Sequence, residues 1–185
     1  MAITQIDNKT ALIVIDLQHG IVALPPQQTV PGVLENAAQL ISAFHQHQQP
    51  VVLVNVAGAA PGRVDRGLGS HGSLPDNWST LVDELPRHSD EILITKQNWG
   101  ALINTELHQQ LQALGVTQVV VIGIATSIGV ESTARQAFEL GYNVTLCSDA
   151  MTDLNLDNHA HSIAAVFPML GEVGTTQDLL NVLNR

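Results

Sequence analysis

Short apolar runs recur along the chain and alternate with longer amphipathic stretches. Val, Ile and Leu dominate these runs, which lie at residues 10–15, 51–56, 91–95, 119–122 and 143–147. Short continuous apolar runs are typical of strands that are buried on both faces of a parallel sheet. A weaker run at 170–174 predicts a short sixth strand.

The stretches between these runs predict helices. Apolar residues recur at helical spacing at Val33, Ala37, Leu40, Ile41 and Phe44, at Leu107, Leu111 and Leu114, and at Leu179, Leu180 and Leu183. A further helix is predicted over 157–167, and Thr176 and Asp178 are expected to open the last one. The alternation predicts a Rossmann-like, three-layer α/β/α fold with a mainly parallel six-stranded sheet.

Residues 116–141 form the central unit of this pattern. The run 119–122 ends at Gly123. A helix is expected to follow, with Thr126 and Ser127 as its cap. Its apolar stripe would consist of Val130, Ala134, Ala137 and Phe138. The helix N-terminus would face the carboxyl end of the strand, where parallel α/β sheets bind ligands. Gly129 lies in the first turn, where glycine costs about 1 kcal/mol relative to alanine. Such a glycine indicates a specific reason for its presence.

Two charged residues follow predicted core strands. Asp16 stands at the end of run 10–15, and Lys96, one of only two lysines, stands at the end of run 91–95. Both would point above the sheet. Asp16 is either a functional carboxylate or a loop cap, and Lys96 is either a functional cation or a strand-end lysine that reaches solvent. Cys147, the single thiol, lies inside a predicted strand, which favours a buried apolar residue over a nucleophile.

The composition excludes several classes of protein. The 185 residues suit one domain, 1–185, and 45% are hydrophobic whereas 13% are charged. A net charge of −10 with seven Lys and Arg argues against nucleic-acid binding. We see no signal peptide or membrane span, and one cysteine fits a reducing compartment, so we expect a cytoplasmic protein.

The segment GIATSIGVESTAR, residues 123–135, resembles the signature of the isochorismatase-like hydrolases of the cysteine hydrolase superfamily. Gly129 occupies the place of their nucleophilic cysteine, as in the branch that hydrolyses isochorismate. The resemblance implies strand order 3-2-1-4-5-6, which would bring Asp16, Lys96 and Gly129 around one crevice. It also implies a cis peptide bond between Ile124 and Ala125.

The resemblance further implies roles for individual residues. Asp16 would be the catalytic acid or base, and Lys96 would be paired with it. Expected substrate contacts are Gln18, Arg66, Trp99, Ala125 and Thr126. Arg66, in the segment Arg66–Leu68, would hold a substrate carboxylate, although a solvated loop arginine is an equal alternative. Trp99 would form a pocket wall or pack in the core. The metal-binding Asp-x-His of nicotinamidases is replaced by the sequence NVAGAAPGR, so neither a metal nor a cofactor is expected.

These residues lead to a functional hypothesis with two alternatives. The chain would be a hydrolase of a small organic molecule without a cysteine nucleophile, with Asp16 protonating a vinyl ether as general acid. It would otherwise be a catalytically degenerate member that binds a small ligand or serves as an assembly subunit. A third hypothesis is slow amide or ester hydrolysis by activated water. The apolar composition and the long segment 57–90 predict a homo-oligomer, at least a dimer.

Overall fold

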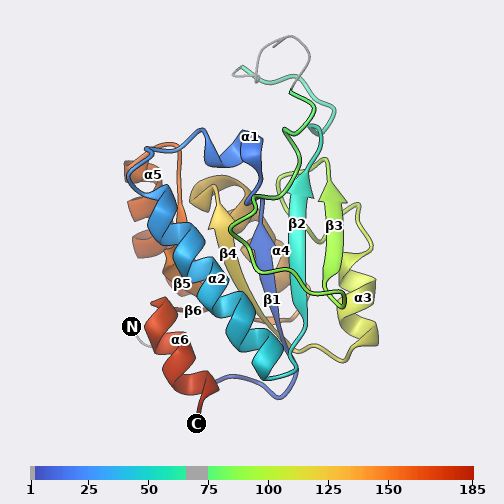
Figure 1. Ribbon diagram of the computed structural model, residues 1–185, viewed down its shortest axis with the longest axis vertical. Helices are drawn as coiled ribbons and strands as arrows, with labels where there is room; N and C mark the ends of the chain where they lie inside the picture. Colours follow the sequence, from blue (N-terminus) through green and yellow to red (C-terminus); the bar gives the residue numbers. More distant parts are fainter. Residues whose placement is uncertain (1–2, 66–74) are drawn as a thin grey trace.

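The computed structural model describes residues 3–65 and 75–185, and six strands form one parallel sheet (Figure 1). The strands are β1 (Thr10–Ile15), β2 (Val51–Val56), β3 (Ile92–Lys96), β4 (Gln118–Ile124), β5 (Asn143–Thr152) and β6 (Glu172–Gly174). Their order is β3-β2-β1-β4-β5-β6, and every pairing is parallel. The predicted fold class and strand order are confirmed.

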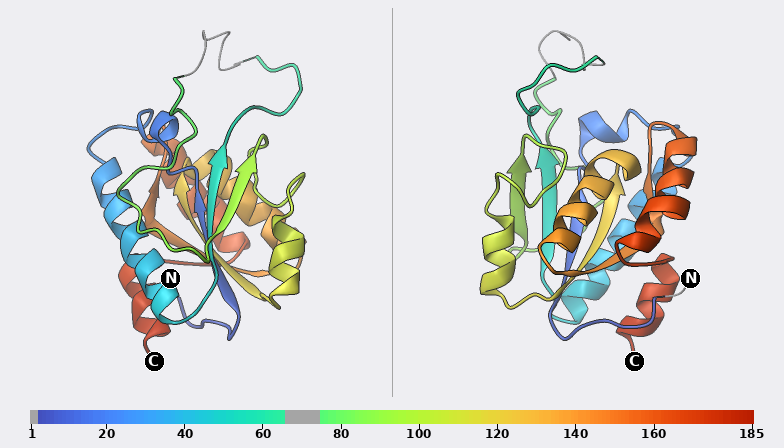
Figure 2. Two further views of the ribbon diagram at one scale, coloured as in Figure 1. Left: turned by 45° about the vertical axis from the view of Figure 1, so that its right-hand side comes forward. Right: turned by 180° about the vertical axis from the view of Figure 1, so that it is seen from behind.

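Helices cover both faces of the sheet (Figure 2). α2 (Val30–Gln46) and α6 (Thr176–Leu183) lie on one face, and α3 (Leu107–Ala113) and α4 (Glu131–Glu139) lie on the other. The short helices are α1 (His19–Val22) and α5 (Leu156–His161), and α5 continues through the π-helical turn η2 (Ser162–Val166) into the 3-10 turn η3 (Phe167–Met169). Alternate residues of β1 enter opposite cores, because successive side chains of a strand point to opposite faces.

The order of the strands reverses between β1 and β4, which lie side by side at the centre of the sheet. Their ladder ends with Ile15 opposite Gly123. Gly123 has φ +119°, and a Cβ there would lie 2.1 Å from the Ile15 carbonyl oxygen, so only glycine fits this close approach. Asp16 follows directly. The chain therefore leaves both central strands at the point where parallel α/β sheets bind ligands.

Two local predictions were wrong, whereas α6 begins at Thr176 with Asp178 in its first turn, as predicted. Phe138 is 50% exposed instead of joining the apolar stripe of α4. Thr126 and Ser127 cap no helix, because α4 begins at Glu131 after the π-helical turn η1 (Thr126–Val130). The last helix is capped by Thr175, whose hydroxyl accepts from the Asp178 N–H in a capping box. None of the described helices is long and apolar enough to cross a membrane.

Candidate active site

Asp16 and Lys96 form a buried ion pair above the ends of β1 and β3. Lys96 Nζ donates to Asp16 Oδ2 over 2.7 Å and to the Asn98 carbonyl over 3.1 Å. Asp16 is 5% exposed and Lys96 is 2% exposed. The pair is thus shielded from water, which strengthens its electrostatic attraction. The two charges that the sequence placed at strand ends do lie together.

The Asp16 carboxylate has one free oxygen. Within the described part of the chain, Oδ1 is buried without a hydrogen-bond partner, whereas Oδ2 is held by Lys96. Burial raises the pKa of Asp16 from 3.8 to about 6, against the opposing attraction of the Lys96 charge. The backbone at Asp16 has φ 52°, a left-handed conformation that aspartate and asparagine tolerate better than most residues. A carboxyl group with a pKa near neutrality and an unengaged oxygen is suited to proton transfer.

Gly129 closes the site from the turn η1. A Cβ added there would lie 2.8 Å from Ile15 Cγ2, 3.3 Å from Asp16 Oδ2 and 3.5 Å from the Trp99 carbonyl. The space of the first side-chain carbon is not free, because Ile15 Cγ2 already occupies it. Glycine instead lets the turn pack closely against the end of β1. The predicted meeting of Asp16, Lys96 and Gly129 is confirmed.

The predicted cis peptide bond between Ile124 and Ala125 is present. Ala125 and Thr126 are both buried beside it. The Ile128 and Val130 N–H groups both donate to the Ala125 carbonyl, over 3.1 Å each. The Ser127 N–H donates to Asp153 Oδ2 over 2.7 Å. The N–H groups of Ser127 and Ile128 in this turn are therefore engaged within the protein.

Sequence reasoning missed two residues that hold this turn. Asp153 is 1% exposed and accepts from the N–H groups of Ser127 and Asn155. His159 Nδ1 lies 2.8 Å from Thr126 Oγ1, and burial lowers the pKa of His159 while the nearby Asp153 charge raises it. The available signal was a carboxylate and a histidine directly after β5, the neighbour of β4.

Two expected substrate contacts have other roles. Gln18 is fully buried, and its amide bonds the Val56 N–H and the carbonyls of Val56 and Trp78, so it anchors the segment after β2 instead of facing a ligand. The Trp99 side chain is 66% exposed, so it neither packs in the core nor walls a buried pocket. Arg66, with Gly67, Leu68 and His71, lies outside the described residues.

Cys147 is fully buried within β5, and burial raises its pKa strongly, so the thiol is neither accessible nor activated. This agrees with the interpretation of Cys147 as a core residue. Among residues 3–65 and 75–185, one group of three potential metal ligands comes together, His45, His88 and Asp90. These residues lie near the start of β2 and β3, at the opposite end of the sheet from Asp16.

Comparison with known proteins agrees with this fold and these strand ends. A model of the isochorismatase domain matches residues 10–178. The chain belongs to the isochorismatase family. It is similar to YwoC of Bacillus subtilis (strain 168), an uncharacterized isochorismatase family protein, with 39% identity over 180 residues, 94% of this chain and 93% of YwoC.

Other similarities place this isochorismatase family member among hydrolases. The ureidoacrylate amidohydrolase RutB of Acinetobacter baylyi (strain ATCC 33305 / BD413 / ADP1) is 28% identical over 210 residues, covering 97% of this chain and 86% of RutB. The structure of an isochorismatase family protein from Burkholderia thailandensis superimposes with a TM-score of 0.91 at 37% identity and covers 98% of both chains. The family membership supports a hydrolase.

Proposed function

We propose that this isochorismatase family member hydrolyses a small organic molecule without a protein nucleophile, with Asp16 acting as general acid on a vinyl ether. Isochorismate, which carries an enolpyruvyl group, is the substrate we expect. The observation that supports this most strongly is the free oxygen of Asp16. Oδ1 is buried and has no hydrogen-bond partner among residues 3–65 and 75–185, while Lys96 holds Oδ2, the oxygen that lies toward Gly129.

The proposed reaction needs one proton and one water molecule. Asp16 Oδ1 transfers its proton to the terminal vinyl carbon, and the adjacent carbon becomes an oxocarbenium ion. Water adds to that carbon and gives up one proton, which restores the proton that Asp16 donated, and the resulting hemiketal breaks down to pyruvate and the ring alcohol. Lys96 stabilises the Asp16 carboxylate that remains after the transfer. No covalent bond to the protein forms.

A pKa of about 6 leaves roughly a tenth of Asp16 protonated at pH 7. That fraction supplies the acid in each turnover, and the ionised majority supports a second candidate function. An ionised Asp16 would activate water as general base for amide hydrolysis, the reaction class that the name of RutB describes. The two functions differ in the protonation state that they require.

A substrate assay separates these functions from a catalytically degenerate protein. The purified protein is incubated at pH 6 with isochorismate and, separately, with a panel of ureido and carbamoyl amides. Release of pyruvate from isochorismate alone supports the acid mechanism. Release of ammonia from an amide would replace it with the base mechanism. Saturable binding without any product would favour a ligand-binding or assembly role.

A further inference from the structure

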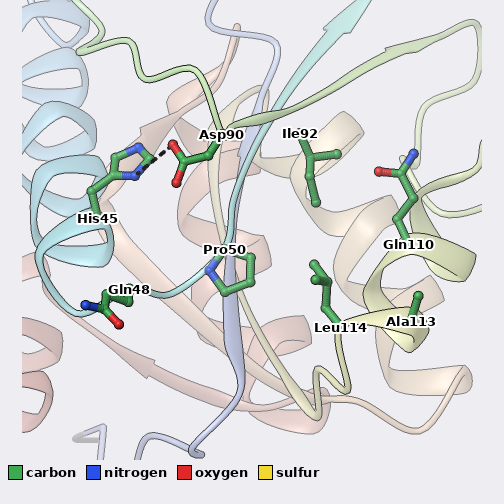
Figure 3. Close-up of a pocket in the computed structure, with 8 residues that line it drawn as sticks. All are labelled: His45, Gln48, Pro50, Asp90, Ile92, Gln110, Ala113 and Leu114. Atoms are coloured by element: carbon green, nitrogen blue, oxygen red, sulfur yellow. Dashed lines mark ion pairs between the residues drawn. The ribbon is translucent and has the colours of Figure 1, made fainter.

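Three metal-ligating side chains meet at the opposite end of the sheet from Asp16. His45 lies in the last turn of α2, and His88 and Asp90 lie in the segment that precedes β3. One ligand atom from each lies within 4.8 Å of the others. The Asp90 carboxylate is turned toward the His45 ring beside an open pocket of about 530 Å³ (Figure 3).

The neighbour on the other side of His45 fixes the position of its proton. His45 Nε2 lies 3.4 Å from Glu91 Oε1, a long hydrogen bond. The Glu91 side chain is 1% exposed, and its second oxygen accepts from Arg87 Nε over 3.0 Å. Since an ionised carboxylate can only accept, Nε2 is the donor. With Nε2 as the donor, a neutral imidazole would present the lone pair of Nδ1 on its other side.

That lone pair faces a second acceptor. Nδ1 lies 3.8 Å from Asp90 Oδ1, beyond hydrogen-bond distance. A divalent cation between Nδ1 and Oδ1 would bridge this gap, because an imidazole nitrogen and a carboxylate oxygen are both ligands of such ions. The site is also at the carboxyl end of the 17-residue helix α2, where the helix dipole favours positive charge.

The distances need little adjustment to hold a zinc-type ion. Ligand atoms about 2.1 Å from a tetrahedral zinc ion are roughly 3.3 Å apart, compared with 3.8 Å between Nδ1 and Oδ1 here. The Asp90 side chain is 77% exposed and is free to move by this amount. His88 stacks on His45 with ring centroids 3.8 Å apart and planes 22° apart, so its ring must turn to point a nitrogen at the ion. His88 is exposed, so the rotation costs it mainly the stacking contact with His45.

We propose that His45, His88 and Asp90 bind one divalent cation of the zinc type. Two imidazoles and a carboxylate suit this class of ion, and water from the open pocket completes the coordination. Glu91 is a positioning residue, because a carboxylate that accepts from the far nitrogen of a ligating histidine fixes its tautomer. The ion ties the last turn of α2 to the segment that leads into β3. This proposed site departs from our expectation that no metal is bound. That expectation was based on the strand ends near Asp16.

The competing arrangement is a doubly protonated His45 between Glu91 and Asp90 without an ion. Calorimetric titration of the chelator-treated protein with zinc chloride at pH 7.5 should show one saturable site. His88→Gln and Asp90→Asn should each weaken binding at least about tenfold, and Glu91→Gln by roughly 10–100-fold. His47→Gln, at an exposed histidine next to the same helix end, is the control and should bind as the wild type does.

Nitrogen NMR of the His45 ring gives an independent readout. Zinc should shift the signal of His45 Nδ1, the nitrogen that faces Asp90. Three results would each overturn the proposal: no saturable zinc binding by the wild type, wild-type binding by both His88→Gln and Asp90→Asn, or a His45 Nδ1 signal that saturating zinc leaves unchanged.

Discussion

Gly129→Ala tests the close packing of the turn η1 against the end of β1. The new methyl carbon would lie 2.8 Å from Ile15 Cγ2, well inside van der Waals contact. Ile15 is fully buried and β-branched, so its side chain has no alternative rotamer into open space. The turn or the strand end must therefore move.

The expected magnitude follows from two opposing effects. Overpacking a buried site costs about 1–3 kcal/mol. Replacing a helical glycine by alanine returns up to about 1 kcal/mol. The net loss of unfolding free energy should be about 0–2 kcal/mol, which lowers the Tm of a domain of this size by up to roughly 8 °C.

Gly32→Ala is the matched control. Gly32 lies within α2, and a Cβ there would meet no atom within 4 Å. This variant should gain up to about 1 kcal/mol and show a higher Tm. Thermal unfolding followed by circular dichroism compares both variants with the wild type. A Gly129→Ala protein that is stabilised as much as Gly32→Ala would refute the packing argument.

Three further predictions concern the ion pair and the assembly. If Asp16 is the general acid, kcat/KM for isochorismate should fall as the pH rises through about 6, the raised pKa of Asp16, whereas a rise over the same range would indicate a base. Lys96→Met leaves an ionised Asp16 unpaired, so urea unfolding at pH 8 should show a loss of about 3–5 kcal/mol. The destabilisation should be smaller at pH 5. Because the pKa of Asp16 is raised in the folded protein, its stability contribution is complete below pH 3.8 and disappears as the pH rises through about 6. An equal destabilisation at pH 5 and pH 8 would contradict this. Light scattering at micromolar concentration should give at least a dimer, and a mass near 19.8 kDa would contradict the expected homo-oligomer.

The sequence was most informative where one local pattern decides the outcome. The apolar runs predicted β1, β2 and β4 closely, because strands buried on both faces leave no polar positions. The meeting of Asp16 and Lys96 was implied by the family resemblance, which gave the strand order that places the ends of β1 and β3 at one edge of the sheet.

Contacts that depend on irregular backbone were not predictable from the same patterns. β5 runs to Thr152 because its register with β4 shifts between Val121 and Gly123, and this extension carries Asp153 to the turn η1. The crowding at Gly129 arises from Ile15, which is distant in sequence. The exposure of Trp99 likewise depends on the path of the chain after β3. The apolar character of the side chain does not predict that path.

The kcat/KM of Asp16→Asn for isochorismate tests the central claim most directly. Asparagine tolerates the φ of 52° at this position and can still accept from Lys96, so the fold and the buried contact should persist while the transferable proton is lost. We expect a fall of about 10²–10⁴-fold, the usual contribution of general acid–base catalysis, with Asp83→Asn at an exposed aspartate as active as the wild type. An Asp16→Asn protein that folds normally and keeps wild-type kcat/KM would contradict the account.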